Sequence, residues 1–509
     1  MSSSYSQILR SSAITGGAAG INMLISMASV KFGAVLLGPA AFGQLRVFHA
    51  FLGFASSLAN LGIQDSAVRS IARASGVDDL AEAAKVAKAA RRIAWTLGLS
   101  TWFLVAALSW PLSHLVFGTH EQALAIAVLG VTIPLGLVTG SRLAVHRGFR
   151  RIGDLARINV ITASGSTAVS VGLYAWLRES GIVPAIICAA LIAFVVPLLF
   201  RHRLPTLPPH AMPFSETVRL GKSMVGLGVS MLVASLMSAL VGIVIPSLVT
   251  RELGASAMGM YAAAWGLSGL FANFILNAMG ADYFPRLSAA SHDTALMSRL
   301  VNEQTAVGVL LALPGLVATV VLAPLAIAIF YSAAFQPAAE LLPWYALGIF
   351  GRVTSWPLGF VMLARQQSKT FIVAEVCFGG LWIGLTQLGV AVSGLVGVAW
   401  AFCALYAIYN VVVLLIVGRG GAVRWQYATV RLVVLSLALF GGVALTRLLP
   451  DPWNYAAGGA GVIVAGVSAL RGLAACLGRD HRLVRRVARS PLVGRILPQY
   501  SQAATRHSP

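Results

Sequence analysis

Residues 182–200, IVPAIICAALIAFVVPLLF, contain no charged side chain and no alternation of polar and apolar positions. At a rise of 1.5 Å per residue, a helix of this length crosses the ~30 Å hydrocarbon core of a bilayer. A transmembrane barrel would instead need short strands with a polar inner face. The stretch therefore predicts a membrane-spanning helix.

Similar runs recur along the chain, which is 58% hydrophobic and only 10% charged, whereas soluble proteins carry about 25% charged residues. They predict an all-α integral membrane protein of about fourteen spanning helices, with twelve or thirteen as alternatives. The expected helices lie near 13–37, 43–63, 93–113, 123–142, 158–177, 182–200, 223–249, 258–281, 304–330, 339–363, 371–391, 393–417, 431–449 and 453–475.

These runs predict five parts of the chain. Residues 1–200 would form an N-terminal lobe of six helices, 201–222 a cytoplasmic linker, and 223–417 a C-terminal lobe of six helices. Two more helices within 418–476 and a basic cytoplasmic tail, 477–509, would follow. The loop 64–92 carries charges in helix-forming surroundings, so we expect a short helix along the membrane face there.

The positions of Lys and Arg predict the orientation, because retained cytoplasmic loops are the basic ones. With the N-terminus inside, only Arg178, Arg251 and Arg447 of the 37 bases fall in outer loops. Both termini are therefore expected in the cytoplasm, where the tail would fix the topology or bind anionic lipid. Because the chain lacks a soluble domain, its net charge of +21 does not predict nucleic-acid binding.

Two short segments, 37–43 (LGPAAFG) and 253–259 (LGASAMG), share the pattern LGxxAxG at the same place in each block of six helices. Six helices return the chain to the same side, so the two lobes would be parallel repeats. Such repeats commonly place a substrate site between them. The pattern favours a two-lobed transporter that works by alternating access.

Together with residues 61–63 (LGI), 67–69 (AVR), 284–288 (FPRLS) and the stretch 330–342, these turns resemble a known family. They are similar to the polysaccharide flippases of the multidrug/oligosaccharidyl-lipid/polysaccharide exporter superfamily, notably the Wzx-type O-antigen flippases and, more distantly, the lipid II flippases. The resemblance spans about residues 10–420 and implies two six-helix lobes around a central cavity, with two helices appended.

The resemblance also implies an activity. It is the transfer of undecaprenyl-diphosphate-linked oligosaccharide from the cytoplasmic to the periplasmic leaflet of the bacterial inner membrane. The product would serve a cell-surface polysaccharide, such as lipopolysaccharide O-antigen or exopolysaccharide. The implied partners are this lipid-linked sugar, membrane lipids, a polysaccharide polymerase and glycosyltransferases.

Lys31 and Arg352 are the deepest charges in the predicted helices. A charge at mid-bilayer costs about 2.5–3.5 kcal/mol, so it usually faces a cavity or a partner. Cations would suit a diphosphate head group, and we expect Lys31, Arg46 and Arg352 to contact it. Each has an alternative. Lys31 would extend its side chain to the membrane interface, and Arg46 would lie at the interface without a role in binding. Arg352 would form an ion pair with Glu375.

Further polar and aromatic side chains are candidates for lining the sugar path, and each alternatively packs or forms hydrogen bonds between helices. His49 lies three residues after Arg46, on the same helical face, and a core histidine is its other interpretation. The candidates are Asn22, Gln44, His49, Trp265, Asn273, Asn277 and Glu375.

Two other functions stay open. A cation-coupled multidrug antiporter of the same superfamily would need a membrane-embedded carboxylate, for which Glu375 and Asp282 are the candidates. A membrane polysaccharide polymerase or ligase would need catalytic groups on an outer loop, and these loops are short and carry no carboxylate pair. Walker A, HExxH and GxSxG signatures are absent, and the four cysteines have no metal spacing. We therefore expect no catalytic residue, cofactor or metal.

Overall fold

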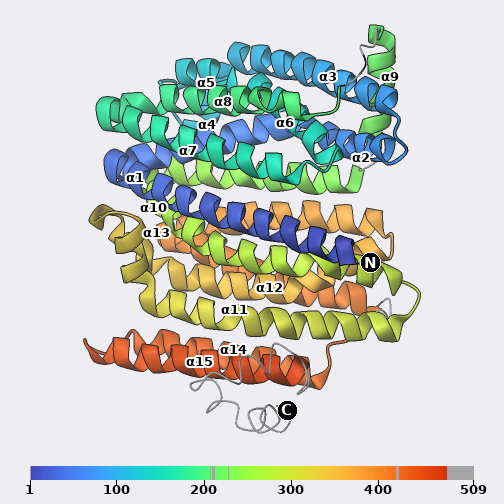
Figure 1. Ribbon diagram of the computed structural model, residues 1–509. Helices are drawn as coiled ribbons and strands as arrows, with labels where there is room; N and C mark the ends of the chain where they lie inside the picture. The colour runs from blue at the N-terminus through green and yellow to red at the C-terminus, as the bar shows by residue number, and fades with distance from the viewer. Residues whose placement is uncertain (1, 207, 209–211, 227–228, 420–422, 478–509) are drawn as a thin grey trace. The chain divides into compact units, whose positions relative to one another are not determined.

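The computed structural model of the chain describes residues 2–206, 208, 212–226, 229–419 and 423–477, without the side chains of 2–16, 222–232, 270–275, 277–282 and 477. Over these residues the secondary structure is helical, with no strand. The predicted basic tail lies outside the described residues, apart from its first position. The chain divides into two compact units (Figure 1).

Unit 1 comprises Met1–Ala262 and the short segment Phe330–Phe335. Its elements are α1 (Ser2–Asn60), α2 (Ile63–Gly76), α3 (Leu80–Ala107), α4 (Ser109–Phe117), α5 (Ala123–Leu129), α6 (Thr132–Gly148), α7 (Ile152–Leu177), η1 (Arg178–Gly181), α8 (Ile182–Leu199), η2 (Arg201–Arg203), α9 (Phe214–Gly226) and the first half of α10 (Val229–Ala289). The loop 64–92 contains the amphipathic helix α2, but the charged residues 78–88 on which the expectation of a short helix rested lie just before and at the start of the long helix α3.

Unit 2 comprises Ala263–Ile329 and Gln336–Pro509. Its elements are the rest of α10, α11 (Thr294–Phe330), most of η3 (Ala333–Glu340), α12 (Leu342–Ala364), α13 (Ser368–Arg419), α14 (Tyr427–Thr446) and α15 (Trp453–Leu477). The predicted lobe boundaries near residues 200 and 222 stay a prediction.

Nine helices in the described part of the chain are long and apolar enough to cross a membrane, or ten when α3 and α4 count as one broken span. Three of the long helices, α1, α10 and α13, each contain an internal kink that joins two helices. The described helices are therefore consistent with the predicted fourteen spans, although they do not fix that number.

Glycine sets the kinks of α1 and α10. Gly38 has φ 71° and ψ 177°, and Gly254 has φ 88° and ψ 167°. A side chain disfavours this backbone conformation, which is essentially restricted to glycine. Both glycines are the second residue of an LGxxAxG turn, so the repeated motif encodes the same reversal of direction twice.

Two predicted helices are interrupted, which corrects their expected bounds. The helix expected over 93–113 begins at Leu80 and bends by 75° at Leu108, between α3 and α4. The helix expected over 123–142 stops at Leu129 and resumes at Thr132. A proline follows each break, Pro111 and Pro134, and neither can donate the main-chain hydrogen bond that would continue the helix.

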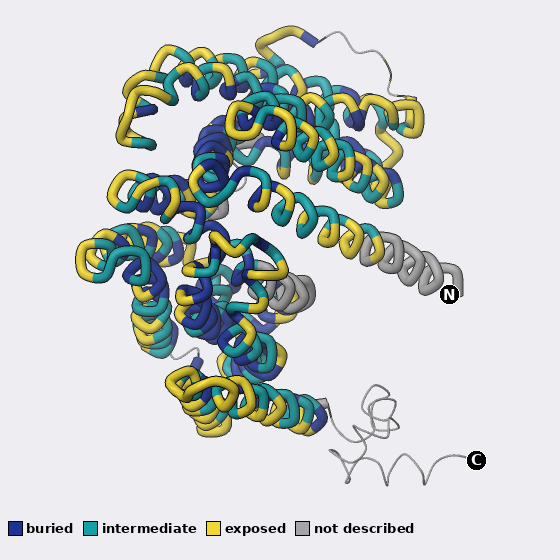
Figure 2. Tube along the Cα trace, turned by 90° about the vertical axis from the view of Figure 1, so that its left-hand side faces the viewer, coloured by how far each residue is buried: buried dark blue, intermediate teal, exposed yellow. Residues whose placement is uncertain are grey.

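Large apolar side chains cover much of the outer surface of both units. Leu24, Phe103 and Trp176 are 68%, 66% and 81% exposed. Buried positions concentrate where helices of one unit face each other (Figure 2). Such a distribution suits a protein surrounded by lipid, because apolar side chains on its outer surface contact hydrocarbon and gain nothing from being buried.

Candidate functional site

Lys31 lies half-buried in the first part of α1, in the middle of an apolar run. Its Nζ donates a hydrogen bond to the main-chain carbonyl of Tyr331, in the segment Phe330–Phe335 of the same unit. The charge therefore lies inside the unit beside main-chain oxygen, and the structure ties α1 to a segment 300 residues further along the chain.

Arg46 lies after the Gly38 kink, in the second part of α1. Its guanidinium carbon is 5.5 Å from the centre of the Phe42 ring, a distance typical of a cation–π contact. The Phe42 ring in turn meets the rings of Tyr331 and Phe335 edge-on, at 6.0 and 5.7 Å. Lys31 and Arg46 thus share one aromatic neighbourhood, which we call the α1 cation cluster: Lys31, Phe42, Arg46, Tyr331 and Phe335.

The kink explains how two cations 15 positions apart come to this cluster. It folds the second part of α1 against the first, so that a Cβ added at Gly33 would be in ordinary contact with the Phe42 ring, at 3.8 Å. Without the glycine conformation at Gly38, a straight helix would carry Lys31 and Arg46 about 22 Å apart along its axis.

Three predicted lining residues also belong to α1. His49 is exposed and Gln44 is half-exposed, in the same part of α1 as Arg46. Asn22 precedes Lys31 in the first part, and its side-chain oxygen is buried without a hydrogen-bond partner among the described residues. A sugar hydroxyl or a water would satisfy this oxygen.

Arg352 belongs to unit 2, in α12, and is half-buried. Among the described residues its guanidinium forms no hydrogen bond and no ion pair, and the pair with Glu375 that the sequence left open is not formed. Glu375 is half-buried on α13, and both charges lie within electrostatic range of the Tyr406 hydroxyl.

A polar network beside Arg352 fixes α12 against α13. Asn410 donates through Nδ2 to the carbonyl of Gly351 at 2.8 Å, and Thr354 donates through Oγ1 to Asn410 Oδ1 at 3.0 Å. These contacts flank Arg352 on both sides along α12. They fix the rotation of α12 about its own axis. They therefore also fix the direction in which the Arg352 side chain extends from the helix.

Trp265 packs in an aromatic cluster of unit 2, against Tyr345, Trp382 and Phe402 at 5.6, 5.8 and 5.2 Å between ring centres. These contacts agree with the alternative that Trp265 packs between helices rather than lining the sugar path. Asn273 and Asn277 lie on α10, but their side chains fall outside the described residues.

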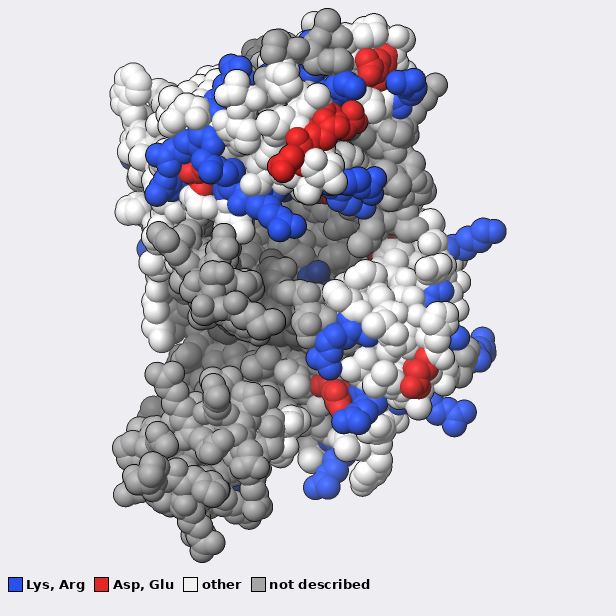
Figure 3. Space-filling view, turned by 45° about the vertical axis from the view of Figure 1, so that its right-hand side comes forward, with Lys and Arg blue, Asp and Glu red and all other residues white. Residues whose placement is uncertain are grey.

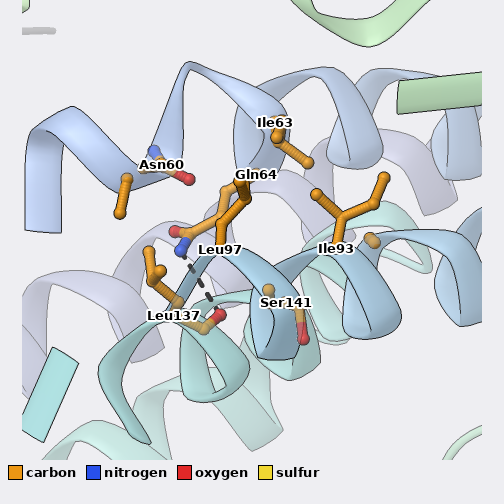
Figure 4. Close-up of a pocket in the computed structure, with 10 residues that line it drawn as sticks. Asn60, Ile63, Gln64, Ile93, Leu97, Leu137 and Ser141 are labelled. Atoms are coloured by element: carbon orange, nitrogen blue, oxygen red, sulfur yellow. Dashed lines mark hydrogen bonds between the residues drawn. The ribbon is translucent and has the colours of Figure 1, made fainter. Parts of the chain in front are cut away.

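Unit 1 also contains a small pocket lined by the end of α1 and by α2, α3 and α6 (Figure 4). Its polar groups are Asn60, Gln64 and Ser141, and Gln64 donates to the carbonyl of Leu137 at 3.5 Å. None of the ten lining residues is a carboxylate, so this pocket offers neutral hydrogen-bonding groups rather than a cation site.

Sequence reasoning did not single out Arg142, an arginine in α6. Its Nη1 donates to the carbonyl of Phe194 at 2.8 Å, and its guanidinium carbon is 4.0 Å from the Phe194 ring centre. Both contacts satisfy the charge within the unit, so Arg142 is part of the packing between α6 and α8. It is the last residue of the helix expected over 123–142.

Taken together, the charged groups of the predicted site are mainly cations. Lys31, Arg46 and Arg352 are on helices, and Glu375 is the one carboxylate among the predicted site residues. Such groups can bind phosphate oxygens by charge-assisted hydrogen bonds. They are poorly suited to binding an organic cation.

Residues 34–340 match the protein family described as polysaccharide biosynthesis protein. The chain is 23% identical over 391 residues to the lipid III flippase of Escherichia coli (strain K12), which covers 74% of this chain and 90% of that protein. The lipid III flippase of Shigella flexneri matches with the same identity and coverage.

Solved structures with a similar fold include the lipid II flippase MurJ in an inward closed conformation. The TM-score is 0.67 with 13% sequence identity, over 91% of this chain and 98% of that one. An inward-facing multidrug resistance MATE family transporter of the MOP superfamily gives a TM-score of 0.64 with 15% identity, over 77% and 93%. At these identities the likeness concerns the fold alone, and it confirms the predicted all-α membrane architecture.

Proposed function

This chain belongs to the family of polysaccharide biosynthesis proteins, and from that premise we propose that it is a flippase for undecaprenyl-diphosphate-linked oligosaccharide. It moves this lipid from the cytoplasmic to the periplasmic leaflet of the bacterial inner membrane by alternating access. The lipid-linked sugar then serves the synthesis of a cell-surface polysaccharide. The lipid III flippases among its relatives and the fold it has in common with MurJ support this assignment.

The α1 cation cluster is the observation that carries the proposal. Lys31 and Arg46 place two positive charges and several N–H donors next to three aromatic rings, inside an apolar helical unit. A diphosphate that leaves water loses its hydration, and cations in a low-dielectric site offset part of that loss. Arg352 supplies a third cation from unit 2, where no described carboxylate neutralises it.

Neutral polar groups are the proposed contacts for the sugar part of the substrate. Asn22, Gln44 and His49 lie on the same helix as the two cations and can exchange hydrogen bonds with hydroxyl groups. The polyprenyl tail stays in lipid, because ~0.8 kcal/mol per buried CH₂ group opposes its transfer into water.

The proposed topology places both termini and the basic loops in the cytoplasm, in agreement with the positive-inside rule. The glycosyltransferases that build the sugar would then act on the face where the flippase takes it up. A polysaccharide polymerase would use it on the opposite face.

The test is transfer of a fluorescent undecaprenyl-diphosphate oligosaccharide between the leaflets of proteoliposomes that contain the full-length chain. We expect transfer by the intact protein and a loss of at least about tenfold in Lys31→Ala, Arg46→Ala and Arg352→Ala, since one charge-assisted contact is worth roughly 1.5 kcal/mol or more. Lys369→Ala removes an exposed cation at the start of α13 and serves as the matched control.

The outcomes separate function from site. Transfer that all three variants leave unchanged would discard the three residues as head-group contacts while the flippase assignment stands. No transfer by the intact protein, together with efflux of an organic cation that depends on Glu375, would overturn the flippase assignment in favour of the antiporter.

A further inference from the structure

Asp154 is the centre of an arginine cluster at the start of α7. It is 7% exposed and forms ion pairs with Arg151 at 3.2 Å, Arg203 at 3.2 Å and Arg157 at 3.6 Å. One carboxylate can balance only one of three guanidinium groups. The cluster therefore keeps an excess of about two positive charges, and Asp154 is the only acid between residues 147 and 177.

The three arginines are not equivalent. Arg151 and Arg203 lie closest to the carboxylate, with 44% and 39% of their side chains exposed, whereas Arg157 is the most distant and 60% exposed. Because the Arg157 side chain is mostly exposed, its ion pair with Asp154 at 3.6 Å contributes little stability. Arg157 can therefore turn toward another anion while Arg151 and Arg203 keep Asp154 paired. Blue side chains surround a small red area on this face of unit 1 (Figure 3).

A groove runs beside this cluster, between α1 and α7. Small and apolar residues line it, among them Gly17, Ala18 and Ile21 of α1 and Gly153 and Ala156 of α7, and Arg157 is its one charged lining residue. A hydrocarbon chain fits such a surface, because small residues leave room between two helices.

We propose that the Arg157 cluster and the α1–α7 groove form one binding site for an anionic phospholipid of the bilayer. The phosphate accepts hydrogen bonds from Arg157, supported by the excess charge of Arg151 and Arg203, and one acyl chain lies in the groove. The basic loop between α6 and α7 places the cluster on the face predicted to be cytoplasmic, where membranes carry anionic lipid. The site involves none of the residues assigned to flipping.

Two substitutions test the two halves of the site. Arg157→Gln removes the charge but keeps the length and polarity of the side chain. Gly153→Leu fills the groove, and it should do so without a clash, because a Cβ added at Gly153 has no neighbour within 4 Å. Arg73→Gln removes an exposed arginine from the last turn of α2 and is the control.

The measurement is titration of the delipidated full-length protein with phosphatidylglycerol and, separately, with phosphatidylcholine of identical acyl chains, followed by native mass spectrometry. We expect one phosphatidylglycerol to bind at least about tenfold more tightly than phosphatidylcholine, a difference that corresponds to ~1.4 kcal/mol. Arg157→Gln and Gly153→Leu should each weaken phosphatidylglycerol binding by about tenfold, and Arg73→Gln should not.

Thermal unfolding without lipid checks that each variant is folded. Equal binding of the two lipids would overturn the proposal, and so would phosphatidylglycerol binding that Arg157→Gln or Gly153→Leu leaves at the level of the intact protein. Because the assay measures binding and not transfer, its result is independent of the flippase assignment.

Discussion

Gly43 and Gly259 bring the two LGxxAxG turns into main-chain contact within unit 1. A Cβ added to Gly43 would lie 2.7 Å from the amide nitrogen of Gly259 and 2.2 Å from the carbonyl oxygen of Ala255. A Cβ added to Gly259 would lie 2.0 Å from the carbonyl oxygen of Pro39. The repeat therefore encodes both the kinks and the surface through which the two kinked segments touch.

Alanine at Gly43 or Gly259 should destabilise the protein, because main chain rather than a flexible side chain occupies the space that the methyl group needs. We expect a loss of about 1–3 kcal/mol for each variant, as for other overpacked positions. The measurement is thermal unfolding of the purified protein in detergent. Gly53→Ala is the control on the same helix, since a Cβ there has no neighbour within 4 Å and should be neutral or slightly stabilising.

The sequence predicts the architecture because apolar runs and the recurrence of LGxxAxG are local signals. Breaks inside helices were less predictable. Pro111 and Pro134 accompany interruptions, but Pro357 lies inside the continuous helix α12, where Tyr283 donates a hydrogen bond to the Pro357 carbonyl at 2.9 Å. Whether a proline breaks a membrane helix depends on what packs beside it, which residue order does not give.

Of the candidate site, the sequence predicts only the residues that carry a charge. Lys31, Arg46 and Arg352 stand out because cations are rare in apolar helices. Their partners do not stand out, since Tyr331 is 300 residues from Lys31 and supplies a main-chain oxygen that any residue carries. Asn410 likewise gave no signal, because its importance lies in contacts with Gly351 and Thr354.

Lys31 has two possible roles, and two substitutions separate them. Lys31→Gln keeps an N–H donor for the Tyr331 carbonyl but removes the charge, whereas Lys31→Arg keeps both. If Lys31 binds the diphosphate, Lys31→Gln should lower transfer by at least about tenfold while the free energy of unfolding changes by less than about 1 kcal/mol. Lys31→Arg should retain most of the transfer.

A purely structural Lys31 gives the opposite pattern. Lys31→Gln would then lower the unfolding temperature and leave transfer per folded molecule unchanged. Measurement of both quantities on the same preparation decides between the two roles.

Arg352 and Glu375 distinguish the flippase from the antiporter. Because no described residue pairs with the Arg352 guanidinium, Arg352→Gln should leave the free energy of unfolding within about 1 kcal/mol of the original value or raise it. Transfer of the lipid-linked sugar should nevertheless fall by at least about tenfold. Glu375→Gln removes a negative charge from the same unit and should leave transfer unchanged or increase it, as measured in proteoliposomes.

A proton- or sodium-coupled mechanism predicts otherwise. If Glu375 is the coupling carboxylate, Glu375→Gln abolishes transport and removes its dependence on the ion gradient. That result would reassign Glu375 from a tolerated neighbour of Tyr406 to the centre of the cycle.

Asn302 anchors the start of α14 to α11. It is 3% exposed, donates through Nδ2 to the carbonyls of Ser298 at 2.7 Å and Arg424 at 2.9 Å, and accepts from the main-chain amide of Gln426 at 2.8 Å. Gln426 directly precedes α14, so these bonds fix the point at which α14 begins.

Asn302→Ala leaves the Gln426 amide and the Arg424 carbonyl without this partner, and we expect a loss of about 2–4 kcal/mol in the free energy of unfolding. Hydrogen exchange should also accelerate over residues 423–430, because the start of α14 loses its attachment to α11. Glu303→Gln is the matched control, since it breaks only the exposed pair with Arg299 at 2.7 Å, which is worth at most about 1 kcal/mol. Unchanged exchange over 423–430 in Asn302→Ala would mean that apolar contacts, and not this side chain, hold α14 in place.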